Sequence, residues 1–134
     1  MSRPFNEQTD PGTLGVGVVL REERTITEAD ITEFARLAGD QGRHHLPGSG
    51  RQMAHGLLTA SLATKIGGQL NFIARRMEWE FLRPVWAGDT ITALVTVRGS
   101  TETRSGTRLD LGIEIRNQDG ETVLLGESTG VVRH

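Results

Sequence analysis

The apolar residues of this chain follow two different spacings, a helical one in the first half and an alternating one in the second. Over residues 28–38 they recur every three or four positions, which predicts a helix with one apolar face. Thr27, followed three positions later by Asp30, is typical of a capping box at the start of such a helix. Gly39 suits the left-handed position that closes a helix, so the helix is expected to end there.

A second helix is predicted to begin near His55 or Gly56 and to run to residues 67–68. Its residues are apolar or small over most of its surface, and Lys65 is its only charge. A helix with so little charge is expected to be buried on most sides. The intervening residues 41–52 are polar and contain proline and glycine, which predicts a loop.

Alternation of apolar and polar residues, typical of half-buried strands, marks the remaining segments. Strands are expected over residues 16–24, 77–82, 90–98, 109–116 and 121–132. The last four are expected to pair as a meander. The sequence therefore predicts an α+β fold, in which an antiparallel sheet of about five strands wraps around one long buried helix.

Size and composition indicate a single domain over residues 1–134, with residues 1–14 as a polar N-terminal arm. The net charge of −2 gives no strong field for nucleic acid or an anionic membrane. No apolar run approaches the roughly 20 residues that span a membrane. The chain has no cysteine, which excludes thiolate nucleophiles and cysteine-based zinc sites. The first residues contain no secretory signal, so a cytoplasmic location is expected.

The candidate chemistry lies in the loop between the helices, where Asp40 precedes His44, His45 and His55. A carboxylate beside an imidazole is a common acid–base pair, because the carboxylate orients the ring and histidine titrates near neutral pH. From the residue types alone, the alternative is that Asp40 caps a turn and His45 is a solvated loop residue. The three histidines could also bind a metal, but no metal site is predicted without further ligands.

The start of the second helix could polarise a bound carbonyl group. Unpaired N–H groups around Gly56 and Leu57 favour a developing negative charge, and Gly56 has no side chain to obstruct a ligand. The alternative is that Gly56 only allows close packing. Ser61 lacks the surrounding glycines of a hydrolase nucleophile, so a core-facing serine bonded to a backbone carbonyl is expected.

Several arginines adjoin the second helix or the loops, where they could bind phosphate groups or be solvated surface residues. They are Arg43, Arg51, Arg75, Arg76 and Arg83.

Taken together, these segments resemble the MaoC-like, (R)-specific enoyl-CoA hydratase branch of the hotdog superfamily. Residues 34–40 match the start of the family's F-A-x-x-x-x-D-x-N-P-[IL]-H stretch, and His45 falls at the spacing of its histidine. Residues 54–62 match the H-G-x-x-x-x-x-L opening of its helix. Residues 81–90 are similar to its F-x-x-P-V-x-x-G-D strand and turn, so the resemblance spans about residues 25–98.

The resemblance implies a single hotdog domain that adds water to, or removes it from, an enoyl thioester. CoA or phosphopantetheine would be part of the substrate, and no separate cofactor is expected. Asp40 and His45 would activate the water and supply the proton to the α-carbon. Gly56 would donate its backbone N–H to the thioester carbonyl, and Ser61 would help to orient the site. A homodimer joined edge to edge between sheets is also implied, with no nucleic-acid or membrane partner.

The other expected substrate contacts are His44, His55, Leu57, Arg75, Arg76 and Arg83. The chain departs from the family pattern in three places. Gly42-Arg43 replaces the family's Asn-Pro, His44 replaces an aliphatic residue, and the segment before the helix is shorter. These departures imply a more open acyl pocket or an unusual acyl group, and they leave open whether His44 or His45 is catalytic. Addition of another nucleophile, thioester hydrolysis and non-catalytic binding of an acyl thioester remain alternatives.

Overall fold

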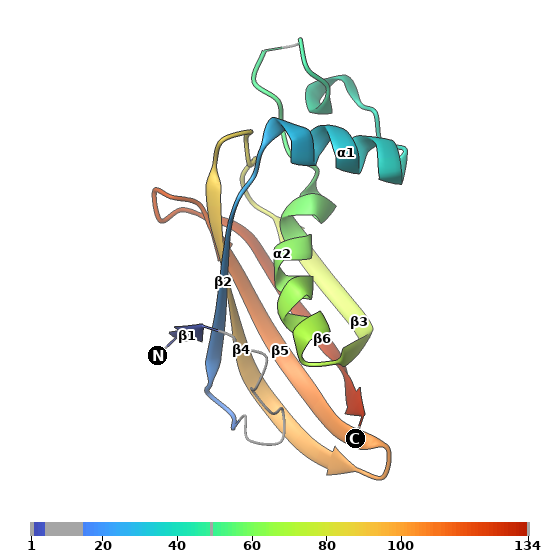
Figure 1. Cartoon of the computed structure of the whole chain (residues 1–134). Coiled ribbons are helices and arrows are strands. Elements are labelled where there is room, and N and C mark those ends of the chain that lie inside the picture. The colour runs from blue at the N-terminus through green and yellow to red at the C-terminus, as the bar shows by residue number, and fades with distance from the viewer. Residues whose placement is uncertain (1, 5–14, 49, 134) are drawn as a thin grey trace.

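The computed structural model describes residues 2–4, 15–48 and 50–133. The described residues form a sheet, two α-helices and a short 3-10 helix, η2 (Figure 1). The elements are β1 (Ser2–Pro4), β2 (Val19–Thr25), α1 (Glu28–Ala38), η2 (Arg43–His45), α2 (Gly56–Gln69), β3 (Phe72–Phe81), β4 (Thr90–Thr103), β5 (Gly106–Arg116) and β6 (Thr122–Arg133). The expected N-terminal arm therefore includes the short strand β1, and residues 5–14 of it lie outside the described part.

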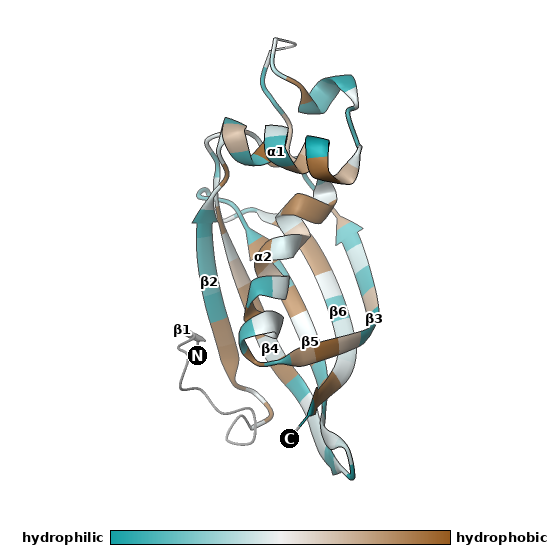
Figure 2. Ribbon diagram, turned by 45° about the vertical axis from the view of Figure 1, so that its right-hand side comes forward, coloured by the Kyte–Doolittle hydropathy of each residue, from teal (hydrophilic) through white to brown (hydrophobic). Residues whose placement is uncertain are grey.

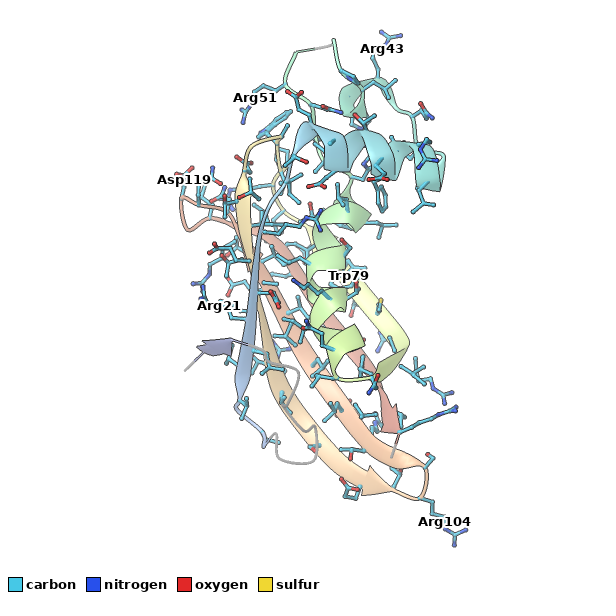
Figure 3. The ribbon with its side chains drawn as sticks, viewed as in Figure 1. Arg21, Arg43, Arg51, Trp79, Arg104 and Asp119 are labelled. Carbon is cyan, nitrogen blue, oxygen red and sulfur yellow. The ribbon has the colours of Figure 1, made fainter. Side chains whose placement is uncertain are left out.

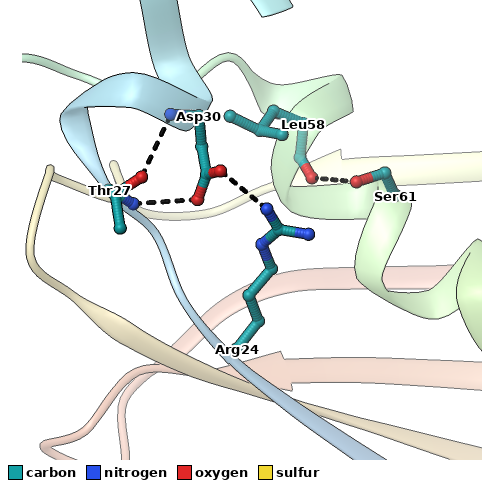
Figure 4. Close-up of polar contacts among 5 residues, drawn as sticks. All are labelled: Arg24, Thr27, Asp30, Leu58 and Ser61. Atoms are coloured by element: carbon teal, nitrogen blue, oxygen red, sulfur yellow. Dashed lines mark hydrogen bonds and ion pairs between the residues drawn. The ribbon is translucent and has the colours of Figure 1, made fainter. Parts of the chain in front are cut away.

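Local signals in the sequence place α1 correctly. The Thr27 hydroxyl accepts a hydrogen bond from the Asp30 N–H at 3.1 Å, and the Thr27 N–H donates to the Asp30 carboxylate at 3.0 Å (Figure 4). Gly39 closes the helix at φ 78°, in the left-handed region. Burial raises the pKa of the Asp30 carboxyl, but hydrogen bonds from Thr27 and Arg24 outweigh it, so the pKa lies below its ordinary value.

The sheet has the order β1-β2-β4-β5-β6-β3. Its five long strands are antiparallel, as expected, and β1 adds a short parallel pairing to β2. The predicted four-strand meander is wrong at its first step, because β3 pairs with β6 and not with β4. The connection after β3 instead pairs with the chain before α2, through the Met53–Trp86 bridge and a bond from the Ala54 N–H to the Val85 carbonyl. The connection between β3 and β4 therefore leads to the other side of the sheet, where β4 pairs with β2.

Helix α2 lies on the concave side of the curved sheet (Figure 2). Ile66 is fully buried against Leu20, Ile115 and the other apolar residues of the core. The expectation that α2 is buried on most sides is only partly met, because Leu57 and Ser61 belong to a face that stays exposed. One sheet covers only one side of a helix, so the other side, which includes Lys65, has no cover from the described part of the chain.

Strand β3 forms one edge of the sheet, and most of its residues are exposed. Among the described residues, no helix is both long enough and apolar enough to cross a membrane.

Candidate active site

A cavity of about 880 Å³ lies where the end of α1, the η2 loop and the start of α2 meet the end of β3. The fold brings most of the predicted site residues to it. They are Asp40, His44, His45, His55, Gly56, Leu57 and Arg83. Each position follows from local structure, since Asp40 comes directly after the glycine that closes α1 and His55 is the N-cap residue of α2.

His45 is buried, and its tautomer follows from its neighbours. Its Nδ1 lies 2.7 Å from the Met53 carbonyl oxygen, which can only accept a hydrogen bond. Nδ1 therefore carries the proton of the neutral ring, and Nε2 keeps its lone pair. Nε2 faces the Asp40 carboxylate oxygen Oδ2 at 3.6 Å, and the Asp40 side chain is 59% exposed to the cavity side and solvent. This separation is too long for a direct hydrogen bond, and a water molecule could contact both groups.

His55 fixes the backbone of the catalytic loop. Its Nε2 lies 2.9 Å from the Asp40 carbonyl oxygen, so Nε2–H donates and holds the Asp40 backbone against the start of α2. Its ring stacks on that of His45 with centroids 3.7 Å apart, and the His44 ring, tilted by 51°, has its centroid 3.9 Å from that of His45. The Nδ1 atom of His55 is buried and has no hydrogen-bond partner within the described part of the chain. His45 thus contacts two other imidazole rings, and of the three histidines only His44 is exposed.

The same cluster is the best place for a cation. Asp40, His45 and His55 offer ligand atoms that lie within 4.8 Å of one another. His55 can contribute Nε2 only by giving up its bond to the Asp40 carbonyl, while its Nδ1 has no partner among the described residues.

Gly56 allows an aromatic side chain to pack against the start of α2. A Cβ atom at this position would lie 2.6 Å from Cε1 of Phe81, whose ring lines the cavity. His55 gives the helix no side-chain cap. The first N–H groups of a helix have no acceptor within the helix itself, so they favour negative charge at this end of the cavity. Close packing and carbonyl polarisation, the two alternatives for Gly56, are therefore compatible.

Gln52 and Met53 hold the candidate catalytic histidine, and neither was among the site residues expected from the sequence. Gln52 is buried, and its Nε2 donates to the His45 carbonyl at 2.8 Å and to the Thr32 hydroxyl at 3.1 Å. It thereby joins η2 to α1, while the Met53 carbonyl sets the tautomer of His45. A glutamine in a polar loop carries no sequence signal for such a role, because its partners come from other segments.

Three predicted site residues lie away from the cavity. Ser61 donates to the Leu58 carbonyl at 2.6 Å, as expected, but it is exposed and does not face the core (Figure 4). Arg75 and Arg76 lie on β3, where Arg76 forms an ion pair with Glu78 at 3.8 Å. Because α2 has turned more than once between Gly56 and Ser61, the serine emerges on a different face. The functional roles of these three residues stay predictions.

A sheet curved around a central helix, with an Asp–His pair at the start of that helix, defines a hotdog domain. Comparison with solved structures confirms this class. The (R)-hydratase from A. caviae involved in PHA biosynthesis superposes with a TM-score of 0.78 and 28% identity, covering 90% of this chain and 98% of that one.

Among curated proteins, an (R)-specific enoyl-CoA hydratase from Rhodospirillum rubrum is 31% identical over 121 residues, which are 81% of each chain. A mitochondrial 3-hydroxyacyl-[acyl-carrier-protein] dehydratase from Arabidopsis thaliana is 27% identical over 97% of this chain and 84% of the relative. No family model matches the chain. The chain belongs to the family of (R)-specific enoyl-CoA hydratases and MaoC-like dehydratases, as the sequence motifs predict.

Proposed function

We propose that this protein is a hydro-lyase that adds water to, or removes it from, the 2,3 double bond of an enoyl thioester. The observation that carries the proposal is the pair of Asp40 and His45, whose facing atoms lie 3.6 Å apart in the cavity at the start of α2. The two curated relatives are named for a CoA hydration and a carrier-protein dehydration. Those names support the same reaction class for this chain.

The chemistry follows from the atoms that face the cavity. A water molecule between Asp40 Oδ2 and His45 Nε2 would lose a proton to this pair while its hydroxide bonds to C3 of the substrate. The negative charge that moves to the thioester oxygen would be stabilised by the Gly56 N–H and the start of α2. C2 then takes the proton from the pair, so one water is added in total. Dehydration is the same sequence reversed.

Hydrolysis of the thioester has less support. Helix α2 contains no aspartate or glutamate, the residue type that hotdog thioesterases use at this position. The two reactions separate in one assay, in which crotonyl-CoA is mixed with the wild-type protein. Hydration removes the enoyl absorbance without releasing thiol. Release of free CoA thiol would favour hydrolysis, and binding of the thioester without either change would favour a non-catalytic domain.

We infer further that two copies associate along β3. This strand is a free edge of the sheet, and such edges are usually covered. Ile73, Met77 and Phe81 are large apolar residues that are 44%, 46% and 53% exposed on it. Arg75 and Arg76 lie on the same strand, so in a dimer they would sit at the interface between copies. The cytoplasmic location stays a prediction from the sequence.

A further inference from the structure

A second cavity, of about 250 Å³, adjoins the first one. Arg83 and Pro84 line both cavities, so a long substrate could pass from one to the other along this segment. In the second cavity the guanidinium of Arg51 lies 4.4 Å from the ring centre of Trp86. Figure 3 shows Arg51 on the same side of the molecule as Asp119, in the hairpin between β5 and β6. A guanidinium that lies on an indole ring is suited to a nucleotide, because the base can stack on the guanidinium plane and the phosphates can pair with its N–H groups.

The turn that carries Trp86 is rigidly held. The Trp86 N–H donates to Asp89 Oδ2 at 2.9 Å, and Gln118 donates to Asp89 Oδ1 at 3.0 Å. Trp86 also forms a bridge with Met53, whose carbonyl accepts the Nδ1–H of His45. The backbone of the turn that carries this aromatic ring is therefore fixed relative to the candidate catalytic histidine.

The charges of this cavity are mixed, and most of the carboxylates are already engaged. Asp89 accepts the two hydrogen bonds of the turn, and Glu121 pairs with Arg83 at 3.4 Å. Asp119 remains as an exposed carboxylate on the opposite wall. The Arg51 guanidinium stands over the Trp86 ring and is exposed, so it can reach an incoming phosphate.

We propose that this second cavity binds the nucleotide part of a CoA thioester. The adenine ring stacks on the Arg51 guanidinium, which Trp86 supports from beneath, and the phosphates of the nucleotide pair with the N–H groups of Arg51 and with the solvent side of Arg83. The inference rests on the proposed function, and it assigns CoA as the carrier of the acyl group. A carrier protein presents phosphopantetheine without adenosine and would leave this cavity unused.

The first test is direct binding, measured by calorimetry with free CoA and with adenosine 3′,5′-bisphosphate. We expect Arg51→Ala to raise the Kd of both probes about tenfold, and Trp86→Leu to raise it as well. Arg36→Ala serves as the matched control, because Arg36 is an exposed arginine on α1 that pairs with Glu33 at 3.9 Å and does not line either cavity. Asp119→Asn should tighten binding of both probes, since it removes a negative charge near the phosphates. Equal Kd values for the wild type and Arg51→Ala would overturn the inference.

The second test separates the subsite from the reaction. Hydration of crotonyl-CoA and of crotonyl-pantetheine, which lacks the nucleotide, is compared in the wild type and Arg51→Ala. We expect the variant to raise KM for the CoA thioester only. Equal KM values for both substrates in the wild type would overturn the nucleotide site while the proposed reaction stands. If neither substrate reacts but the bisphosphate still binds through Arg51, the reaction fails and the nucleotide site is supported.

Discussion

The sheet and the loop that carries the candidate site are held by different kinds of contact. The sheet rests on long antiparallel ladders and on an apolar core against α2. The loop between α1 and α2 rests on a few bonds from single side chains, chiefly those of Gln52, His45 and His55. Changes in the core should therefore lower stability, whereas changes in the loop should lower activity in a protein that stays folded.

The largest expected effect is on catalysis. His45→Gln removes the ring whose bare Nε2 faces Asp40, and we expect kcat to fall about 10²- to 10⁴-fold, the usual contribution of a general acid–base group. The measurement is the rate of crotonyl-CoA hydration, with circular dichroism to check the fold. His44→Gln is the matched control, and it should reduce kcat far less. A larger loss for His44→Gln would transfer the catalytic role to the exposed histidine.

A substitution in the core should have the opposite effect, lowering stability and leaving the activity of the folded protein unchanged. Ile66→Ala leaves a cavity between α2 and the sheet, because Ile66 is fully buried. We expect it to lower the free energy of unfolding by about 2–5 kcal/mol, measured by urea denaturation. The folded fraction should keep its kcat. A loss of kcat in the folded protein would show that packing of the core also affects the candidate site.

Gln52 tests whether the loop depends on single bonds. Gln52→Met keeps the volume but removes the N–H donors to His45 and Thr32, so His45 should lose its fixed position. We expect kcat to fall about tenfold with little change in KM, as for a misplaced catalytic group. Gln41→Met, at an exposed glutamine in the same loop, should behave as the wild type. Equal kcat and KM values for the two variants would exclude a role of Gln52 in positioning His45.

Strand β3, at the edge of the described sheet, is a third region, where we expect substitutions to affect dimer formation. Antiparallel pairing of two copies centred on Met77 would place Arg76 opposite Glu78 of the partner subunit. Arg76→Glu and Glu78→Arg should each weaken the dimer by about 1 kcal/mol for each like-charge pair, measured by analytical ultracentrifugation. Mixing the two variants should restore dimers, because each repulsive pair becomes attractive. If each variant alone forms dimers as readily as the mixture does, this register of the two strands is excluded.

The smallest expected effect concerns the cap of α1. Asp30→Asn should cost roughly 0.3–1 kcal/mol of stability at neutral pH, the usual value for a carboxylate at a helix start. The pKa of Asp30 is lowered in the folded state, so its stabilisation is full above the ordinary value of 3.8. It is lost as the pH falls through the lowered pKa. Urea titrations of both proteins at several pH values should converge in acid, and a constant difference would contradict the assignment.

The sequence predicts well what local contacts determine. The capping box of Thr27 and Asp30, the end of α1 at Gly39 and the start of α2 at Gly56 are all confirmed. Asp40 and His45 are only five positions apart in the loop, but their spacing alone does not determine that the two side chains face each other, as they do in the structure.

What the sequence misses depends on contacts between distant segments. Pairing of β3 with β6 leaves no local mark, since alternation shows that a strand exists but not which strand is its neighbour. The role of Gln52 depends on Thr32 of α1, 20 positions away. The exposed face of α2 at Ser61 could not be separated from the buried one, because both faces have small, uncharged residues.

We propose that Asp40 acts in hydration and is not needed for folding, because its side chain is 59% exposed. The most direct test compares the loss of crotonyl-CoA absorbance with the wild type and with Asp40→Asn, at matched protein concentration and with matched unfolding curves. We expect turnover by the wild type and a loss of about 10²-fold or more in the variant. Full activity of a folded Asp40→Asn protein would contradict it.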